Sequence, residues 1–372
     1  MSGALDVRLQ TLLERAVDRR RRVRHGLLAV SRTDGSWSWE GAHGTGAVAG
    51  GPVTTRMRYP IASVTKLFTA VTVLRLVEQG RLALDERIVD VLPAEVTAGL
   101  HVIGEDDHTD RITVEHLLDH SSGLPDYYGE APRGGRSAQD RLLAGEDAPV
   151  PFGEVLRIVR EELTPHFPPQ PFDAPKRRAR YADTNYQLLA AVAEQRTRQA
   201  LSELFDTMLF GPLGLDDTSS YPHPPRSGAS AEPEVHVFAR DVVLQPQGAL
   251  RHQVADGGIV STLADQVRFL TAVVEGAVFE DPATWPRMLQ RRNRIFFPIE
   301  YGLGVMRYAP ARWMSPTFAI PPIVGHTGST ATWSFHCPEL DLVVAGTFDV
   351  AQPPLPFRFL PHVLRAVAGA GR

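Results

Sequence analysis

The sequence has very little cysteine and no surplus of positive charge. Only Cys337 is a cysteine among the 372 residues, so no disulfide can form within the chain, which fits a reducing compartment. Lysine and arginine together number 39 against 43 acidic residues, a formal charge of -4. Because this balance gives no overall positive field, we expect no nucleic-acid partner.

Long apolar runs are also missing. No segment reaches the roughly 18 consecutive apolar residues of a membrane-spanning helix. Residues 1–17 mix charged residues among their leucines, and only the short apolar stretch from Gly26 to Val30 follows the arginines at 19–22. Neither a secretory nor a twin-arginine leader is predicted from this pattern. We therefore expect a cytoplasmic protein with no membrane partner.

The chain does have the apolar content of a globular protein. Hydrophobic residues make up 43% of it and charged residues 22%, which is more apolar than disordered chains are. Its length is two to three times that of a usual domain. We expect either two domains or one large discontinuous unit.

Strand patterns occur toward both ends of the chain, and helical patterns lie between them. A helical apolar stripe covers residues from about 4 to 24, and short strand-like runs follow at 27–32 and 36–40 around a hairpin at 33–35. Two further strands, 332–337 and 342–348, precede a helix near 357–368. The middle is richer in helical patterns and prolines, with exposed loops predicted at 129–136 and 222–234.

These patterns predict an α+β fold. We expect a mostly antiparallel sheet built from residues 1–85 and 250–372, flanked by helices. A mainly helical subdomain of residues 86–249 would be inserted between these two parts. The active site is expected in the cleft between the sheet and the helical subdomain.

A serine and a lysine stand at the start of a predicted apolar helix that runs from Ser63 to Gln79 and ends at Gly80. Ser63 and Lys66 lie three residues apart, so on one helical turn the amine can reach the hydroxyl. A lysine desolvated among apolar neighbours can have a pKa lowered toward neutrality and act as a base. Because this spacing is common by chance, the pair alone is a weak indication of a nucleophile.

Two further short stretches carry groups that can do chemistry. Tyr181 precedes a predicted helix, and a phenol near a lysine can exist partly as phenolate and relay protons. By itself, Tyr181 is more typical of a core aromatic residue whose hydroxyl reaches water. The second stretch, from His326 to Ser329, directly precedes a strand, where its glycine could let a substrate backbone lie along the strand edge.

Together these stretches resemble the three motifs of the penicillin-recognising serine hydrolases, in the branch that holds class C β-lactamases, DD-peptidases and esterases. The resemblance runs from about residue 26 to the end of the chain and implies a β-lactamase/transpeptidase-like fold. The motifs stand as Ser63-Val64-Thr65-Lys66, Tyr181-Ala182-Asp183 and His326-Thr327-Gly328, with supporting stretches Leu117 to Pro125, Gly257 to Thr262 and Tyr301 to Gly304.

The resemblance implies a serine acyl-enzyme that forms without cofactor or metal. Ser63 would attack the carbonyl carbon of a small-molecule ester or amide, and Lys66 and Tyr181 would move the protons. The backbone N–H groups of Ser63 and Ser329 would form the oxyanion hole. The remaining motif residues, Asp183, His326, Thr327 and Gly328, would bind substrate.

The sequence departs from the family pattern at two of these positions. Asp183 stands where the family usually has asparagine, and an ionised aspartate accepts hydrogen bonds but donates none. It would either form a salt bridge with Lys66 or receive a donor from the substrate, or else brace its own loop. His326 stands where many relatives have lysine, and a mostly neutral histidine offers less positive charge to a substrate carboxylate. Both departures point away from β-lactams and acyl-D-Ala-D-Ala.

Other interpretations stay open. The acyl group could pass to an amine or alcohol acceptor, as in transacylases of natural-product pathways, or the chain could be a catalytically silent acyl-binding or sensor protein. His116 and His120 have a spacing that can chelate zinc, but they lack the glutamate of a zincin. The basic run 176–180 could line the mouth of the site for an anionic substrate, although a solvated loop is the simpler interpretation.

Overall fold

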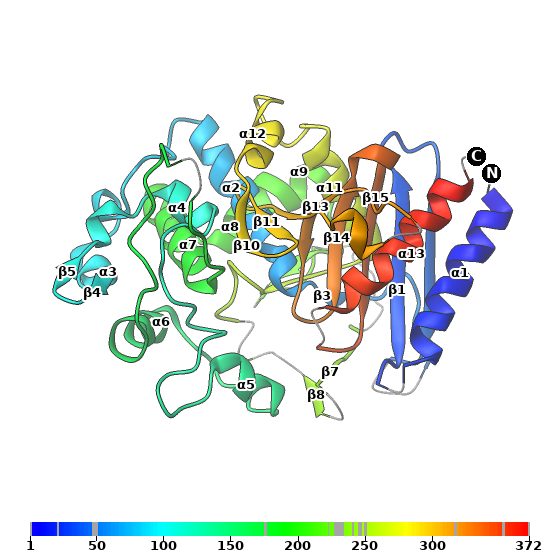
Figure 1. Ribbon diagram of the computed structural model, residues 1–372, viewed down its shortest axis with the longest axis horizontal. Coiled ribbons are helices and arrows are strands. Elements are labelled where there is room, and N and C mark those ends of the chain that lie inside the picture. Colours follow the sequence, from blue (N-terminus) through cyan, green and yellow to red (C-terminus); the bar gives the residue numbers. More distant parts are fainter. Residues whose placement is uncertain are drawn as a thin grey trace.

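A large antiparallel sheet organises the molecule (Figure 1). Of the 372 residues, the computed structural model describes 2–20, 22–46, 51–174, 177–221, 223–226, 234–239, 242–244, 248, 251–315, 318–351 and 354–370. Within these ranges the sheet has eight strands in the order β10-β11-β12-β13-β14-β15-β1-β2. Helices combined with this antiparallel sheet confirm the predicted α+β class.

Strands from both ends of the chain form adjacent positions in this sheet. β1 (His25–Arg32) pairs with β15 (Leu342–Phe348), so that Arg32 lies opposite Leu342, and with β2 (Ser38–Gly44) on its other side. β15 is buried along its whole length, as its unbroken run of apolar and small residues indicates. The predicted strands 332–337 and 342–348 match β14 and β15 residue for residue.

Alternating side chains of the central strands enter two separate cores. Leu28 and Val30 of β1 point into a core shared with the terminal helices α1 (Ser2–Asp18) and α13 (Leu355–Ala370). Leu27 and Ala29 point into a larger core on the opposite side, shared with helix α2 (Thr65–Glu78). Successive side chains of a strand point to opposite faces of the sheet, so the two sets of apolar residues along β1 pack against different helices.

The other elements connect these layers. The remaining strands of the sheet are β10 (Asn293–Phe296), β11 (Ile299–Tyr301), β12 (Met306–Tyr308), β13 (Ile323–Thr327) and β14 (Thr332–Cys337). Short sheets are formed by β3 (Tyr59–Pro60), β9 (Ile259–Ser261) and β6 (Ser219–Ser220), by β4 (Val102–Ile103) and β5 (Asp106–Asp107), and by β7 (Val237–Ala239) and β8 (Val242–Leu244). Further helices are α3 (Ala94–Thr97), α4 (Val114–Leu118), α5 (Ala138–Leu143), α6 (Phe152–Arg157), α7 (Asp183–Thr197), α8 (Leu201–Phe205), α9 (Gly211–Leu213), α11 (Leu263–Val274) and α12 (Thr284–Gln290). Shorter helical turns are Ala62–Val64, Ile88–Asp90, Thr109–Arg111, Ile158–Glu162, Asp206–Phe210, Arg312–Met314 and Pro338–Leu340.

Some predicted boundaries were wrong. Helix α1 ends at Asp18 instead of about residue 24, and the Arg20 guanidinium then donates to the Ala16 carbonyl at 2.7 Å, satisfying one of the helix's last oxygens. Residues 129–136 form a largely exposed loop, as predicted. The loop predicted at 222–234 lies mostly outside the described residues.

No described helix is both long enough and apolar enough to cross a bilayer.

A glycine holds the loop between β11 and β12 directly against α2. A Cβ on Gly304 would lie 2.0 Å from the Cβ of Ala70, and Gly304 has a φ of +76°. We expect Gly304→Ala to lower the free energy of unfolding by roughly 2–4 kcal/mol, because it combines a clash with a left-handed backbone.

The matched control is Gly80→Ala. Gly80 has a φ of +66° but nothing within 4 Å of the added Cβ, so it should lose only about 1 kcal/mol. Urea unfolding of both variants checks this. Equal losses in the free energy of unfolding would show that the close approach of the β11–β12 loop to α2 does not contribute to stability.

Candidate active site

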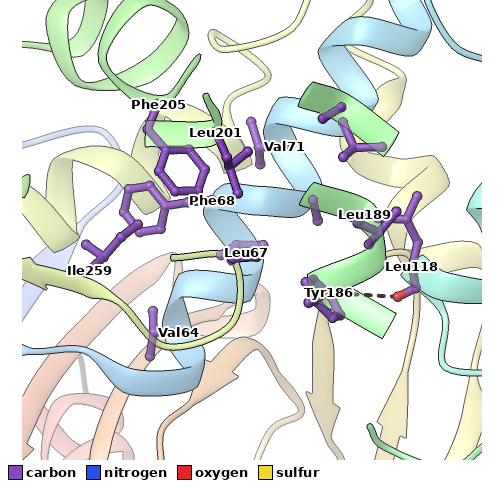
Figure 2. Close-up of a cluster of buried hydrophobic side chains, with 14 of the residues drawn as sticks. Val64, Leu67, Phe68, Val71, Leu118, Tyr186, Leu189, Leu201, Phe205 and Ile259 are labelled. Carbon is purple, nitrogen blue, oxygen red and sulfur yellow. Dashed lines mark hydrogen bonds between the residues drawn. The ribbon is translucent and has the colours of Figure 1, made fainter. Parts of the chain in front are cut away.

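Ser63 lies in a short 3-10 turn, Ala62–Val64, that leads into helix α2. The side chains that follow anchor this turn in the larger core (Figure 2). Phe68 stacks on Phe269 with ring centroids 3.6 Å apart and meets Phe210 edge-on at 6.0 Å. Ala62, just before the serine, has a φ of +46°, a conformation that costs a non-glycine residue energy and is common at functional sites. The buried helix that follows therefore holds the turn with Ser63 in place. Ser63 itself is half-buried.

The end of strand β13 is pressed against this turn. A Cβ on Gly328 would lie 2.7 Å from the Ile61 carbonyl oxygen and 2.9 Å from the Ala62 Cβ. The Thr332 hydroxyl, at the start of β14, donates to the same Ile61 oxygen at 3.0 Å. Gly328 thus permits the close approach that brings the end of β13 to the serine.

Lys66 is fully buried and donates to three oxygens. Its Nζ lies 3.2 Å from Ser63 Oγ, 2.8 Å from the Asp256 carbonyl oxygen and 2.6 Å from Asp183 Oδ1. Of the roles expected for Asp183, the salt bridge with Lys66 is the one found. Asp183 begins helix α7, where free backbone N–H groups also favour its negative charge.

This arrangement corrects the expected charge state of Lys66. Burial by itself would lower the pKa of Lys66, but the charge of Asp183, assisted by Tyr181 and Asp256, outweighs it and raises that pKa well above its ordinary value. Lys66 is therefore a cation at rest. The apolar neighbours in sequence that suggested a neutral amine are overruled by a carboxylate from a distant segment.

Tyr181 lies beside the same pair. Its ring centroid is 5.1 Å from Lys66 Nζ. Burial raises the pKa of Tyr181 well above its ordinary value, although the charge of Lys66 acts to lower it. The phenolate form suggested by the sequence is therefore not the resting form: Tyr181 is a neutral phenol beside Lys66, and its buried hydroxyl has no hydrogen-bond partner among the described residues.

Two further carboxyl groups, the buried Asp256 and the half-buried Asp126, complete the site, and neither was predicted. Asp126 Oδ1 accepts from the Asp183 N–H at 3.0 Å, and Asp256 Oδ2 accepts from the Tyr127 hydroxyl at 3.0 Å. Burial and the charge of Asp183 raise the pKa of Asp256 to about 7 and that of Asp126 well above its usual value. Their positions, just after Pro125 and just before Gly257, adjoin two of the stretches that support the family resemblance.

His326 does not occupy the position expected for a substrate contact. Its ring is fully buried, with Nε2 2.9 Å from the Tyr301 hydroxyl and Nδ1 2.7 Å from the Thr327 carbonyl oxygen. Burial and the charge of Lys66 lower the pKa of His326 to about 3, so the ring is neutral. It can neither reach nor attract a substrate carboxylate.

A second buried histidine supports the segment that carries Tyr181. The His120 ring lies 4.5 Å from the Tyr181 ring and 4.5 Å from the Tyr301 ring. Its Nδ1 accepts from the Ala182 N–H at 3.3 Å and from the Asn185 amide at 2.9 Å. His120 and Tyr301, both in the supporting stretches of the sequence, thus form the layer behind Tyr181.

A small pocket of about 40 Å³ opens at Ser63. Ser63 and Ser329, the expected pair of oxyanion donors, both line it, together with Asp183 and Asp256. Apolar side chains from α5 and the β7–β8 hairpin cover it, namely Leu142, Val237 and Leu244. Thr327 does not line the pocket; it is buried, and its hydroxyl donates to the Thr332 carbonyl oxygen at 2.8 Å.

The described residues hold no group of three or more His, Cys, Asp or Glu side chains that could bind a metal ion. His116, one of the two histidines with zinc-like spacing, instead bonds to the Gln170 carbonyl oxygen through Nε2 at 2.7 Å and to Thr113 through Nδ1.

The connected groups can move a proton away from Ser63. The Ser63 proton can pass to Lys66 Nζ while an Nζ proton passes to Asp183 Oδ1, so that a cationic lysine still serves as a relay. Tyr181, whose ring lies beside Lys66, can deliver a proton to a leaving group. The set is that of an activated serine nucleophile.

Comparison with known proteins gives three findings. A family model described as Beta-lactamase matches residues 9–368. The chain is 31% identical to esterase EstB of Burkholderia gladioli over 63% of its own length and 54% of the esterase, and 28% identical to penicillin-binding protein 4 of Amycolatopsis lactamdurans over 62% and 54%. D-amino acid amidase from Ochrobactrum anthropi SV3, solved with D-phenylalanine, superposes with a TM-score of 0.77 over 99% of this chain and 100% of the amidase at 21% identity.

The chain spans between about a third and a half of the length of the first curated relatives it matches. The solved structure, at this low identity, shows the fold alone.

The neutral state of His326 predicts a pH dependence of stability. The folded pKa is about 3 and the ordinary value is 6.5, so between these limits the unfolded chain binds a proton that the folded chain does not, and stability falls as pH drops below 6.5. In urea unfolding, the loss between about pH 7.5 and about pH 5 should be roughly 2 kcal/mol smaller for His326→Asn than for wild type.

The exposed His362 provides the control. Because its ring is in solvent in the folded chain as well, His362→Asn should keep the wild-type pH dependence. A His326→Asn variant whose loss equals that of wild type would show that the buried ring accepts a proton in the folded state.

Proposed function

The chain belongs to the beta-lactamase family, and we propose that it is a serine acyl hydrolase that cleaves an ester or amide of a small molecule through an acyl-enzyme on Ser63. The observation that carries the proposal is the continuous path from Ser63 Oγ through Lys66 Nζ at 3.2 Å to Asp183 Oδ1 at 2.6 Å. Relatives named as an esterase and as D-aminopeptidases support an ester or amide as the bond that is broken.

Acylation begins when the Ser63 oxygen forms a bond to the carbonyl carbon of the substrate. The hydroxyl proton moves to Lys66 as Lys66 passes a proton to Asp183. The backbone N–H groups of Ser63 and Ser329 stabilise the negative charge on the former carbonyl oxygen, and each such donor is typically worth about 3–4 kcal/mol.

Release of the leaving group returns the proton from Asp183 through Lys66 and Tyr181. As the bond to the leaving nitrogen or oxygen breaks, Tyr181 donates its phenolic proton to that atom and recovers one from Lys66, which Asp183 then reprotonates. Water then attacks the acyl carbon and gives a proton to Lys66 as Lys66 passes one to Asp183; the bond from Ser63 to the acyl group breaks, and the proton returns from Asp183 through Lys66 to the Ser63 oxygen. Every residue ends in the protonation state in which it began, and these steps use no cofactor.

The covered pocket at Ser63 favours a small apolar acyl group. Leu142, Val237 and Leu244 supply its apolar wall, and Tyr128 completes it. Binding of an apolar acyl group against this wall is favourable by about 25 cal/mol per Å² of apolar surface buried. A charged acyl chain gains no such binding free energy.

Asp183 makes β-lactams poor substrates. Its carboxylate is held by Lys66 and has no proton to donate to the amide carbonyl of an acylated β-lactam side chain. We therefore expect nitrocefin to be turned over far more slowly than a reactive aryl ester of a short aliphatic acid. Measurement of kcat/KM for both substrates checks this, and nitrocefin rates like those of a dedicated β-lactamase would contradict it.

Transfer to an acceptor is the second candidate, because a cavity of about 670 Å³ adjoins Tyr181 where an amine or alcohol acceptor could bind. The same residues serve transfer and hydrolysis. Mass spectrometry of products formed from a reactive ester, with and without amine and alcohol acceptors, separates the two. Products unaffected by any acceptor count against transfer.

Labelling of Ser63 tests the proposed function itself. A fluorophosphonate probe should add one label to the wild-type chain, and Ser63→Ala should abolish both the label and ester hydrolysis. Lys66→Ala should slow labelling by about a thousandfold, because it removes the amine that lies 3.2 Å from Ser63 Oγ and relays its proton.

Ser36→Ala, an exposed serine on a hairpin, is the control and should label like wild type. Wild-type protein that takes no label would favour the silent acyl-binding scaffold over an enzyme.

A further inference from the structure

The pocket at Ser63 is too small for most acyl groups. Its volume of about 40 Å³ gives room for only a few groups the size of a water molecule. In the proposed acyl-enzyme the carbonyl group lies beside Ser63 and Ser329, which line this pocket, so an acyl group of two or three carbons fills the space. A longer acyl chain has to displace part of the pocket wall.

The β7–β8 hairpin is the firmly held part of this wall. It contributes Val237 and Leu244. Its main chain is hydrogen-bonded to the segment that follows β15, since the Phe238 N–H donates to the Asp349 carbonyl oxygen at 2.6 Å and the Ala351 N–H donates to the Phe238 carbonyl oxygen at 3.0 Å. Movement of the hairpin would break these bonds.

Helix α5 is the weakly held part. It lies at the lower edge of the molecule in Figure 1, next to β8. Leu142 is the one buried residue among its six, and it packs in a small cluster separate from the two large cores. Other side chains of α5 border open space: Ala138 and Arg141 line a cavity of about 480 Å³, and Asp140 and Leu143 line one of about 640 Å³.

The two ends of α5 differ in how they are fixed. Near its start, the Gln139 N–H donates to the carbonyl oxygen of Tyr128, which also lines the pocket, at 2.9 Å. Near its end, Leu142 is followed by Gly145, whose φ of +89° lies in the region that favours glycine. The end that carries Leu142 is therefore the part of the wall that a longer acyl chain can move at least cost.

We propose that Leu142 sets the acyl-chain length that this enzyme accepts. Acyl groups of two or three carbons bind with α5 in place, whereas longer chains bind only by pushing Leu142 and the end of α5 outward, which takes the leucine out of its apolar contacts. The inference rests on the proposed function and narrows its substrates to esters or amides of short-chain acids.

Two esters that differ only in acyl length test the proposal. p-Nitrophenyl propionate and p-nitrophenyl hexanoate share a leaving group and have similar carbonyl reactivity. Wild type should prefer propionate in kcat/KM by about tenfold or more, as expected where added methylenes do not fit a pocket. In Leu142→Ala this preference should fall by about tenfold, chiefly through faster hexanoate cleavage, with propionate changed less than about threefold.

Leu143→Ala is the matched control. It makes the same change at the next residue of α5, which lines the cavity of about 640 Å³ instead of the Ser63 pocket, and it should keep the wild-type preference. Leu142→Phe separates a limit on chain length from a general loosening of the fold, because the larger side chain should strengthen the preference for propionate.

The outcomes distinguish this inference from the proposed function. Equal cleavage of both esters by wild type, or a preference unchanged in both Leu142 variants, would overturn the role of Leu142 and leave the serine hydrolase standing. Failure of any ester to react, with no labelling of Ser63, would overturn both.

Discussion

The buried charge of Lys66 is the constraint from which the rest of the site follows. A fully buried ammonium is several kcal/mol unfavourable unless it is paired and hydrogen-bonded, and here Asp183, the Asp256 carbonyl and the Ser63 hydroxyl all accept from it. Burial, together with the charges of this pair, disfavours further charge on the neighbouring side chains. His326 stays neutral, the pKa of Tyr181 is raised, and Asp126 and Asp256 hold protons more readily than exposed carboxyls do.

The fold holds this pair in place by close packing from two directions. Helix α2 carries Ser63 and Lys66, and its apolar side chains lie in the larger core. Gly328 lets the end of β13 approach the serine turn, and Gly304 lets the β11–β12 loop lie against α2. The candidate active site thus lies where these elements meet, and side chains packed this densely keep its groups in fixed positions.

Local patterns in the sequence predict those structural features that depend only on residues close together in the chain. The strands β14 and β15 were predicted to the residue, because apolar runs bounded by a proline turn determine them. The contact between Ser63 and Lys66 follows from three-residue spacing on one turn. The ionisation state of Lys66 does not follow from this spacing, because the Asp183 carboxylate that determines it is 117 positions away in the sequence.

The central claim is that Asp183 lets a cationic Lys66 activate Ser63 near neutral pH. The most direct measurement is the rate of fluorophosphonate labelling as a function of pH, for wild type and for Asp183→Asn. The account predicts that the variant is slow at neutral pH and gains reactivity only as rising pH removes a proton from Lys66, along an alkaline limb that wild type lacks. A variant whose profile runs parallel to that of wild type would contradict it.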